Sequence, residues 1–197
     1  MTTQQVFRVH KLSNGITLLG EQMPGVSSAA FSILVPSGAV HDPEGKEGAS
    51  TLIAELLNRG AGPWNSQQLS DQFESYGIQR GHSSGIEVSS FSGAMLGENL
   101  GRALELYSIV LLEPRLPEDA LESVKQLALQ DLKALEDEPA SKVMSELARV
   151  FYPEPFGRSQ LGTEAGILGL DIAALREHYR SKYTAGHAII SVAGAFD

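Results

Sequence analysis

Hydrophobic periodicity marks the first part of the chain as a set of strands. Residues 6–12 alternate apolar and polar side chains, a Ser-Asn-Gly turn follows at 13–15, and residues 16–19 resume the apolar pattern. This arrangement predicts a β-hairpin. Residues 29–35 are almost continuously apolar, which is typical of a central strand that is covered on both faces.

The segment 47–60 predicts an amphipathic helix that faces a core. Its apolar residues recur with spacing i, i+3, i+4 and i+7, at Ala49, Leu52, Ile53 and Leu56. Gly60 then ends the pattern. Thr51, Ala54 and Glu55 lie along one side of the same helix.

Helix-like and strand-like spacing alternates through the rest of the chain. Helices are expected at 67–76 with Ser66 as N-cap, 98–112, 117–137, 141–151, 164–168 and 171–182 with Asp171 as N-cap. Paired strands are expected at 78–81 and 86–94 around a turn at 83–85, and a last strand at 187–193. By spacing, the inner face of helix 117–137 includes Leu127, Asp131 and Leu132.

Hairpins mixed with helices predict the α+β class. The expected architecture is a mixed, mostly antiparallel sheet with helices packed on one face, rather than a doubly wound parallel sheet. No internal linker is long enough to divide the chain, so residues 1–197 are expected to form a single domain.

The amino-acid composition and net charge are typical of a soluble globular protein. Apolar residues make up 42% and charged residues 20% of the 197, as in soluble globular domains. The net charge of −9 disfavours nucleic acid or an anionic membrane as a partner. With no cysteine there is no disulfide framework and no thiolate site. Because no signal-peptide pattern and no run of about 18 apolar residues occurs, we expect a soluble, cytoplasmic protein.

The segment around helix 47–60 resembles the inverted zinc motif H-x-x-E-H of the pitrilysin/insulinase peptidases, a family that includes the mitochondrial processing peptidase. In that motif two histidines hold zinc, and the glutamate takes a proton from the metal-bound water. Here Thr51 stands at the first ligand position, Ala54 at the base position and Glu55 at the second ligand position. A methyl group cannot accept a proton. The resemblance therefore implies a degenerate site with no catalytic residue and no bound zinc, although catalytic relatives use that metal.

The resemblance extends over essentially the whole chain. Similar motifs are L-S-N-G at 12–15, S-G-A at 37–39, F-E-S-Y-G at 73–77, G-R at 157–158, L-G-T at 161–163 and V-A-G-A-F-D at 192–197. Asp131 stands where the family has its third zinc ligand, a glutamate. The family's N-A-x-T substrate-contacting segment corresponds to Arg80, Gly81, His82 and Ser83.

The resemblance also implies the wider organisation of the protein. It implies the metallohydrolase fold shared by the processing peptidases and LuxS. Family chains usually carry two such domains in tandem, so residues 1–197 correspond to the N-terminal half.

Three functional hypotheses follow. The preferred one is a non-catalytic subunit that forms a dimer with a homologous catalytic peptidase chain and helps to enclose a peptide substrate. The second is a structural assembly protein, as the core proteins of respiratory complex III largely are. The third is a zinc peptidase with relocated ligands, which would need a base in place of Ala54, and Glu55 itself is the one candidate a helical turn from Thr51.

Glu55 and Asp131 are either the remnants of a metal site that now takes an oxygen-preferring cation, with His82 as a substitute ligand, or, as we expect, two carboxylates left after loss of the ligands. His82 is expected to be an exposed turn histidine, and the other four histidines are expected to be structural or solvated.

Overall fold

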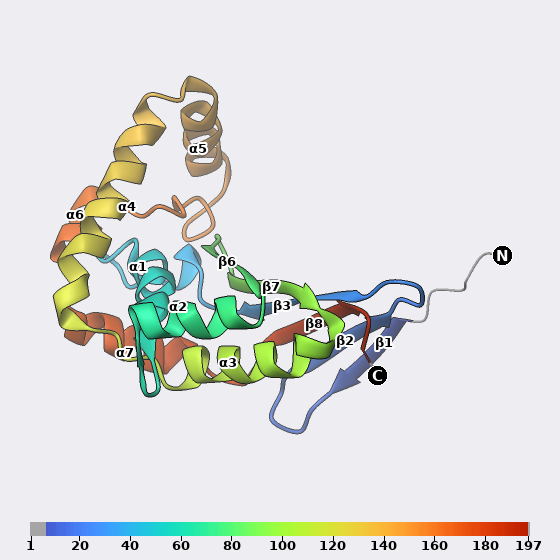
Figure 1. Ribbon diagram of the computed structural model, residues 1–197. Helices are drawn as coiled ribbons and strands as arrows, with labels where there is room; N and C mark the ends of the chain where they lie inside the picture. Colours follow the sequence, from blue (N-terminus) through green and yellow to red (C-terminus); the bar gives the residue numbers. More distant parts are fainter. Residues whose placement is uncertain (1–6, 197) are drawn as a thin grey trace.

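The computed structural model describes residues 7–196, which fold as one six-stranded sheet with helices packed mainly against one face (Figure 1). The strands, in spatial order, are β1 (Phe7–Lys11), β2 (Thr17–Gln22), β8 (Ile189–Gly194), β3 (Ser28–Val35), β7 (Ser89–Leu96) and β6 (Gln79–Ser84). β2 and β8 are parallel, and the other neighbouring pairs of this sheet are antiparallel. The α+β class and the mostly antiparallel sheet are therefore confirmed. The first residue of the expected hairpin, Val6, and the last residue of the chain, Asp197, lie outside the described residues.

The α-helices of the described chain lie between residues 49 and 182. They are α1 (Ala49–Leu56), α2 (Ser66–Ser75), α3 (Leu100–Leu112), α4 (Leu121–Glu136), α5 (Pro139–Phe151), α6 (Glu164–Gly169) and α7 (Ile172–Lys182). A two-stranded ribbon of β4 (Gly60–Ala61) and β5 (Trp64–Asn65) joins α1 to α2. None of the helices among residues 7–196 is long and apolar enough to cross a membrane.

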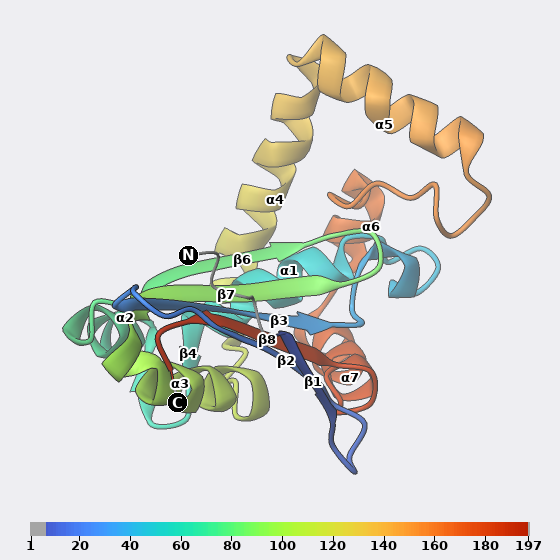
Figure 2. The same cartoon turned by 90° about the vertical axis from the view of Figure 1, so that its right-hand side faces the viewer.

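β3 is central, as its apolar run predicts, but it is not covered on both faces. Ala29, Phe31, Ile33 and Val35 are buried, whereas Ala30 between them is exposed. The alternation arises because helices cover only the face that carries the odd-numbered residues, and the opposite face stays open in the view of Figure 2. On that open face, Ser28 and Ala30 are exposed, whereas Ser32 and Leu34 are half-buried.

Two local predictions need correction. The N-cap of α2 is Asn65 rather than Ser66, because Asn65 and Gln68 form a reciprocal capping box that Ser66 cannot make. The turn between β6 and β7 lies at 85–88 rather than 83–85. There the Gly85 amide donates to the Val88 carbonyl, so β6 is longer and β7 begins later than the apolar pattern suggests.

The two helices after α3 differ most from expectation. On α4 only Val124 and Ala128 are buried, whereas Leu127 and Asp131 are exposed, so the predicted inner face is too wide. The reason is geometric. α4 leaves the body of the protein after its first turns, and α5 returns beside it without a buried residue (Figures 1 and 2).

Candidate functional site

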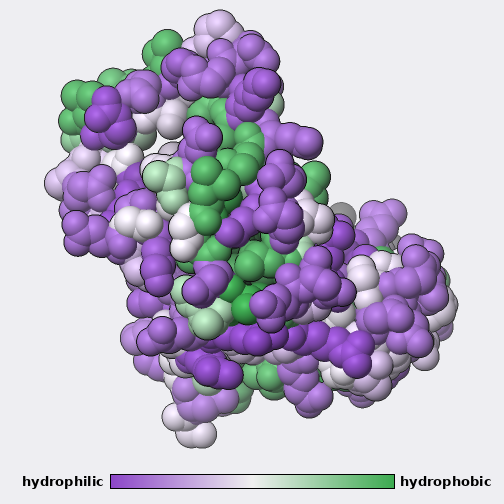
Figure 3. Space-filling view, turned by 90° about the vertical axis from the view of Figure 1, so that its left-hand side faces the viewer, coloured by the Kyte–Doolittle hydropathy of each residue, from purple (hydrophilic) through white to green (hydrophobic). Residues whose placement is uncertain are grey.

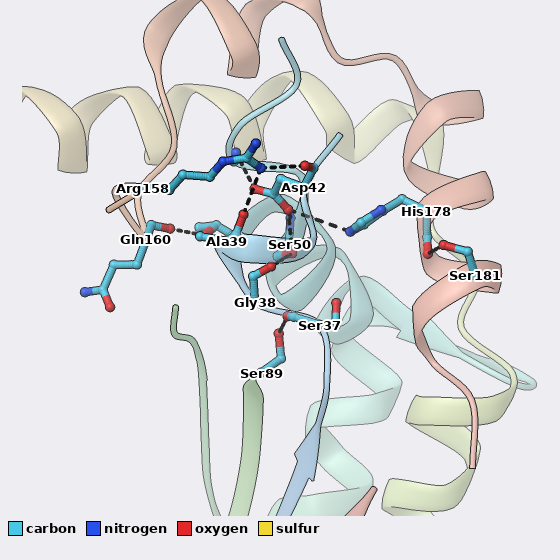
Figure 4. A network of polar contacts seen from close by, with 12 residues as sticks. Ser37, Gly38, Ala39, Asp42, Ser50, Ser89, Arg158, Gln160, His178 and Ser181 are labelled. Carbon is cyan, nitrogen blue, oxygen red and sulfur yellow. Dashed lines mark hydrogen bonds and ion pairs between the residues drawn. The ribbon is translucent and has the colours of Figure 1, made fainter. Parts of the chain in front are cut away.

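The N-terminus of α1 is held by a buried carboxylate rather than by a side chain of its own N-cap, Gly48. The Asp42 carboxylate accepts hydrogen bonds from the Gly48 amide at 2.7 Å and the Ser50 amide at 2.9 Å. The Ser50 hydroxyl also donates to it at 2.6 Å (Figure 4). Three donors therefore satisfy one carboxylate and fix the start of the helix.

A second chain segment is tied to the same place. The Arg158 guanidinium donates to the carbonyl of Asp42 at 2.7 Å and to the carbonyl of Ala39 at 3.3 Å. The Thr163 amide donates to the carbonyl of Glu47 at 3.3 Å. These bonds tie residues 158–163 to the segment that precedes α1, as Figure 4 shows for Arg158.

His178 of α7 completes the network from the other side. His178 is 5% exposed, and its Nε2 atom lies 3.7 Å from Asp42 Oδ1. Burial, acting against the Asp42 charge that would favour protonation, lowers the pKa of His178. Sequence reasoning missed this network, because its members come from two loops, α1 and α7 and share no local pattern.

Each of the three marked positions on α1 makes contacts within the protein. The Thr51 hydroxyl donates to the carbonyl of Gln160 at 2.7 Å, across 109 residues of sequence. Ala54 is 2% exposed. Glu55 Oε1 lies 2.9 Å from His82 Nε2, and this hydrogen bond lowers the pKa of the Glu55 carboxyl.

His82 is exposed, as expected from the sequence, but it does not lie in a turn. It lies inside β6, and its side chain reaches α1. The misplaced turn explains the error, because a strand that extends to Ser84 directs alternate side chains, Arg80 and His82, to the helix-bearing face.

β6 is one of the two edge strands of the described sheet, and it carries the four candidate substrate-contacting residues. The guanidinium of Arg80 lies 4.6 Å from the ring centre of Phe73, and it donates to the Ser70 hydroxyl at 3.1 Å. Gly81 lies against Ser92 of β7, and Ser83 is exposed. Arg80 and His82 thus anchor the edge strand to α2 and α1.

Comparison with known families decides the class of protein. A family model described as Insulinase (Peptidase family M16) matches residues 17–164. The chain belongs to peptidase family M16. The family resemblance inferred from the sequence motifs is thereby confirmed.

Relatives of this M16 chain include bacterial and mitochondrial proteins. An "uncharacterized zinc protease" of Rickettsia bellii is 26% identical over 97% of this chain and 47% of its own length. The mitochondrial-processing peptidase subunit beta of Saccharomyces cerevisiae is 23% identical over 96% of this chain and 41% of its own length. The M16 chain thus spans about half the length of the curated relatives it matches.

Solved structures agree on the fold. A crystal structure of a peptidase M16 inactive domain from Pseudomonas fluorescens superposes with a TM-score of 0.89 over 98% of this chain and 47% of that one, at 20% identity. A protease from Helicobacter pylori gives the same TM-score over the same shares, at 15% identity. At these identities the likeness establishes the M16 fold alone.

Zinc, which the M16 motif implies, does not fit the residues on this α1. Thr51 and Ala54 offer no imidazole or carboxylate, and the Glu55 carboxylate is already paired with His82. Asp131 is exposed on α4. Within residues 7–196, no three His, Cys, Asp or Glu side chains gather closely enough to hold a metal ion.

Proposed function

We propose that this chain is the non-catalytic part of an M16 peptidase. In this proposal it binds an extended peptide along β6, while a homologous chain with an intact H-x-x-E-H motif supplies zinc and cleaves the peptide. The observation that carries the proposal is the use of the motif positions for internal contacts, above all the Glu55–His82 pair at 2.9 Å. That pair occupies the second ligand position and ties it to the edge strand.

The hydrogen-bonding pattern of β6 supports the peptide-binding part. Bonded and non-bonded residue pairs alternate along an antiparallel ladder. The Gly85 amide bonds to Val88, and the register continues without a bulge, so Gly81 and Ser83 bond to β7. The backbone groups of Arg80 and His82 then point to the open edge, where a peptide can add as a seventh strand.

The side chains of Arg80 and His82 hold β6 in its extended conformation. The Arg80 side chain is held on α2 and the His82 side chain on α1, so the strand is already extended before a peptide arrives. Ordering the strand in advance lowers the entropy cost of binding. The net charge of −9 favours a cationic peptide.

Two substitutions at one position test the peptide edge. In the full-length protein, His82→Ala removes the imidazole but keeps the outward amide, whereas His82→Pro also removes that amide. The probe is a fluorescein-labelled peptide of about ten residues with alternating Val and Lys, matched to the length of a strand. Fluorescence anisotropy gives Kd. We expect His82→Ala to bind within about threefold of the wild type and His82→Pro to bind at least about tenfold more weakly.

Two binding results would contradict the proposal that peptides bind along β6. Equal Kd values for the alanine and proline variants, in folded protein of unchanged unfolding midpoint, would mean that peptides do not add to β6. Absence of binding by the wild-type protein, alone and with a homologous chain that carries H-x-x-E-H, would favour a purely structural assembly role. The apolar exposed face of α5 is the observation that favours this second candidate.

A further inference from the structure

The side of α5 that its own chain covers is polar or small. Lys142, Ser145 and Ala148 recur every three residues and are the half-buried residues of this helix. Lys142 is paired with Glu136, the last residue of α4, and Gly157 of the returning chain lies against the carbonyl of Ala148. The chain therefore packs on α5 through the polar side of the helix.

The other side of α5 is apolar and uncovered, and its apolar atoms are visible in Figure 3. Spacings of three, four and seven residues place the apolar side chains on one face. This apolar face consists of Val143, Met144, Leu147, Val150 and Phe151, which are 54% to 76% exposed. The Tyr152 ring extends the face, because its centre lies 5.0 Å from that of the Phe151 ring. α5 thus turns its apolar face away from the rest of the described chain.

The apolar face is large for the surface of a monomer. At about 100 Å² for each partly exposed side chain, the face and Tyr152 together present roughly 600 Å². The largest apolar patch of an ordinary monomer is about 300–600 Å² and often serves binding. Each partner of a standard interface contributes about 800 Å². The face therefore supplies most of the surface that one partner of a stable dimer needs.

The charges of α5 are balanced within the chain. Lys142, Glu146 and Arg149 are the charged residues of the helix. Arg149 donates to Glu146 at 2.8 Å, and Lys142 is paired with Glu136. A two-fold dimer sets each face against its own copy, so a face with charge of one sign would repel itself. The balanced charge therefore suits a second copy of the chain better than a strongly charged partner.

We propose that two copies of the full-length chain associate through the apolar faces of their α5 helices, packed against each other about a two-fold axis. α4 and α5 project from the body of the protein in Figures 1 and 2, so the two helices can meet while the sheets stay apart. Their axes would lie about 8–10 Å from each other. The inference does not rest on the peptide-binding proposal, since the open edge of β6 lies outside this face.

Sedimentation velocity of the full-length protein tests the inference. The concentration runs from about 1 to about 200 μM, on both sides of a Kd on the order of 10 μM, which suits an interface at the small end of the stable range. Leu147→Glu places a charge at the centre of the apolar face. Leu168→Glu on α6 is the matched control, because both leucines are 54% exposed and both lie on helices. Unfolding temperatures at about 1 μM, where the monomer prevails, verify that both variants fold.

We expect the wild type to change from monomer to dimer over this range of concentration. Leu147→Glu should raise Kd at least about 100-fold, because each dimer loses two leucine contacts, and Leu168→Glu should change Kd less than about threefold. A wild type that stays monomeric at about 200 μM would overturn the inference. An equal rise in Kd for the two variants would also overturn it, since α5 would then have no special part in the association.

A mixing experiment distinguishes face-to-face packing from docking of α5 on another surface of the second copy. Fluorescein-labelled Leu147→Glu is titrated with the wild type, so each mixed pair carries one substituted face. Face-to-face packing predicts a mixed Kd about tenfold above the wild-type value. A mixed Kd within about twofold of the wild-type value would mean that the intact α5 docks elsewhere on the variant, and it would overturn the two-fold arrangement.

Discussion

The Asp42 carboxylate replaces an N-cap side chain that α1 cannot have. Gly48 at the N-cap has φ 108°, and a Cβ atom there would come within 2.8 Å of Ile167. Glycine is therefore needed, and the cap must come from elsewhere in the chain. Sequence reasoning could not find this cap, because Asp42 lies six residues before the glycine, in an irregular loop.

Burial of His178 beside this network predicts that stability depends on pH. The folded state holds the pKa of His178 below its ordinary value of 6.5, so the unfolded chain binds the proton first. The contribution of His178 is complete above pH 6.5 and is lost as the pH falls below it, at no more than about 1.4 kcal/mol per pH unit. Burial also lowers the pKa of His41 below its ordinary value.

Urea unfolding at pH 7.5 and pH 5.5 checks this sign. We expect the wild type to lose free energy of unfolding between the two values and His178→Gln to lose less. His10→Gln, at an exposed position of β1, serves as the control and is expected to follow the wild type. An equal pH dependence for His178→Gln would show that His178 does not cause the loss.

At the scale of elements, α1 and α5 have similar amphipathic sequences but opposite environments. Leu52, Ile53 and Leu56 of α1 are fully buried. On α5, by contrast, Leu147 is 54% and Val150 is 76% exposed. Apolar atoms gather over this helix at the upper left of Figure 3. Periodicity reveals an apolar stripe, but it does not reveal which surface covers the stripe.

The exposure of α5 predicts that its apolar face contributes little to folding. The double substitution Leu147→Glu with Val150→Glu should change the free energy of unfolding by less than about 0.5 kcal/mol, as for other surface positions. Val124→Ala on α4 is the comparison, because loss of its fully buried methyl groups should cost about 2 kcal/mol. Urea unfolding measures both. A loss above about 1 kcal/mol in the double variant would mean that α5 packs against the body of the protein.

For the whole molecule, the sequence predicted the class, the order of nearly all elements and the family. Local periodicity and turn chemistry carry that information. The candidate site was predicted only as a set of positions. The contacts of Thr51 with Gln160 and of Glu55 with His82 join residues 109 and 27 apart in sequence, so no local pattern contains them. The exposure of Asp131 follows from the direction of α4, which depends on the whole fold.

The arrangement of α1 and α4 can be tested by rebuilding the motif. The quadruple variant Thr51→His, Ala54→Glu, Glu55→His and Asp131→Glu should hold about one zinc ion per chain after dialysis, by elemental analysis, because the Asp42 network still fixes α1. The triple variant that keeps Ala54 should bind zinc equally, since the glutamate there is a base rather than a ligand. A folded quadruple variant without zinc would mean that Asp131 does not occupy the third-ligand position.

The place of β8 in the sheet has a consequence for synthesis of the protein. β8 is the last strand of the described chain, yet it lies between β2 and β3, which are made near the beginning. Until residue 194 leaves the ribosome, the β1–β2 hairpin has no neighbour and one edge of β3 stays open. Such long-range pairing is slow, and unpaired edges favour aggregation. During synthesis, the edges of β2 and β3 that later pair with β8 therefore stay exposed until β8 is made. A chaperone that covers these strand edges during that time would raise the yield of folded protein.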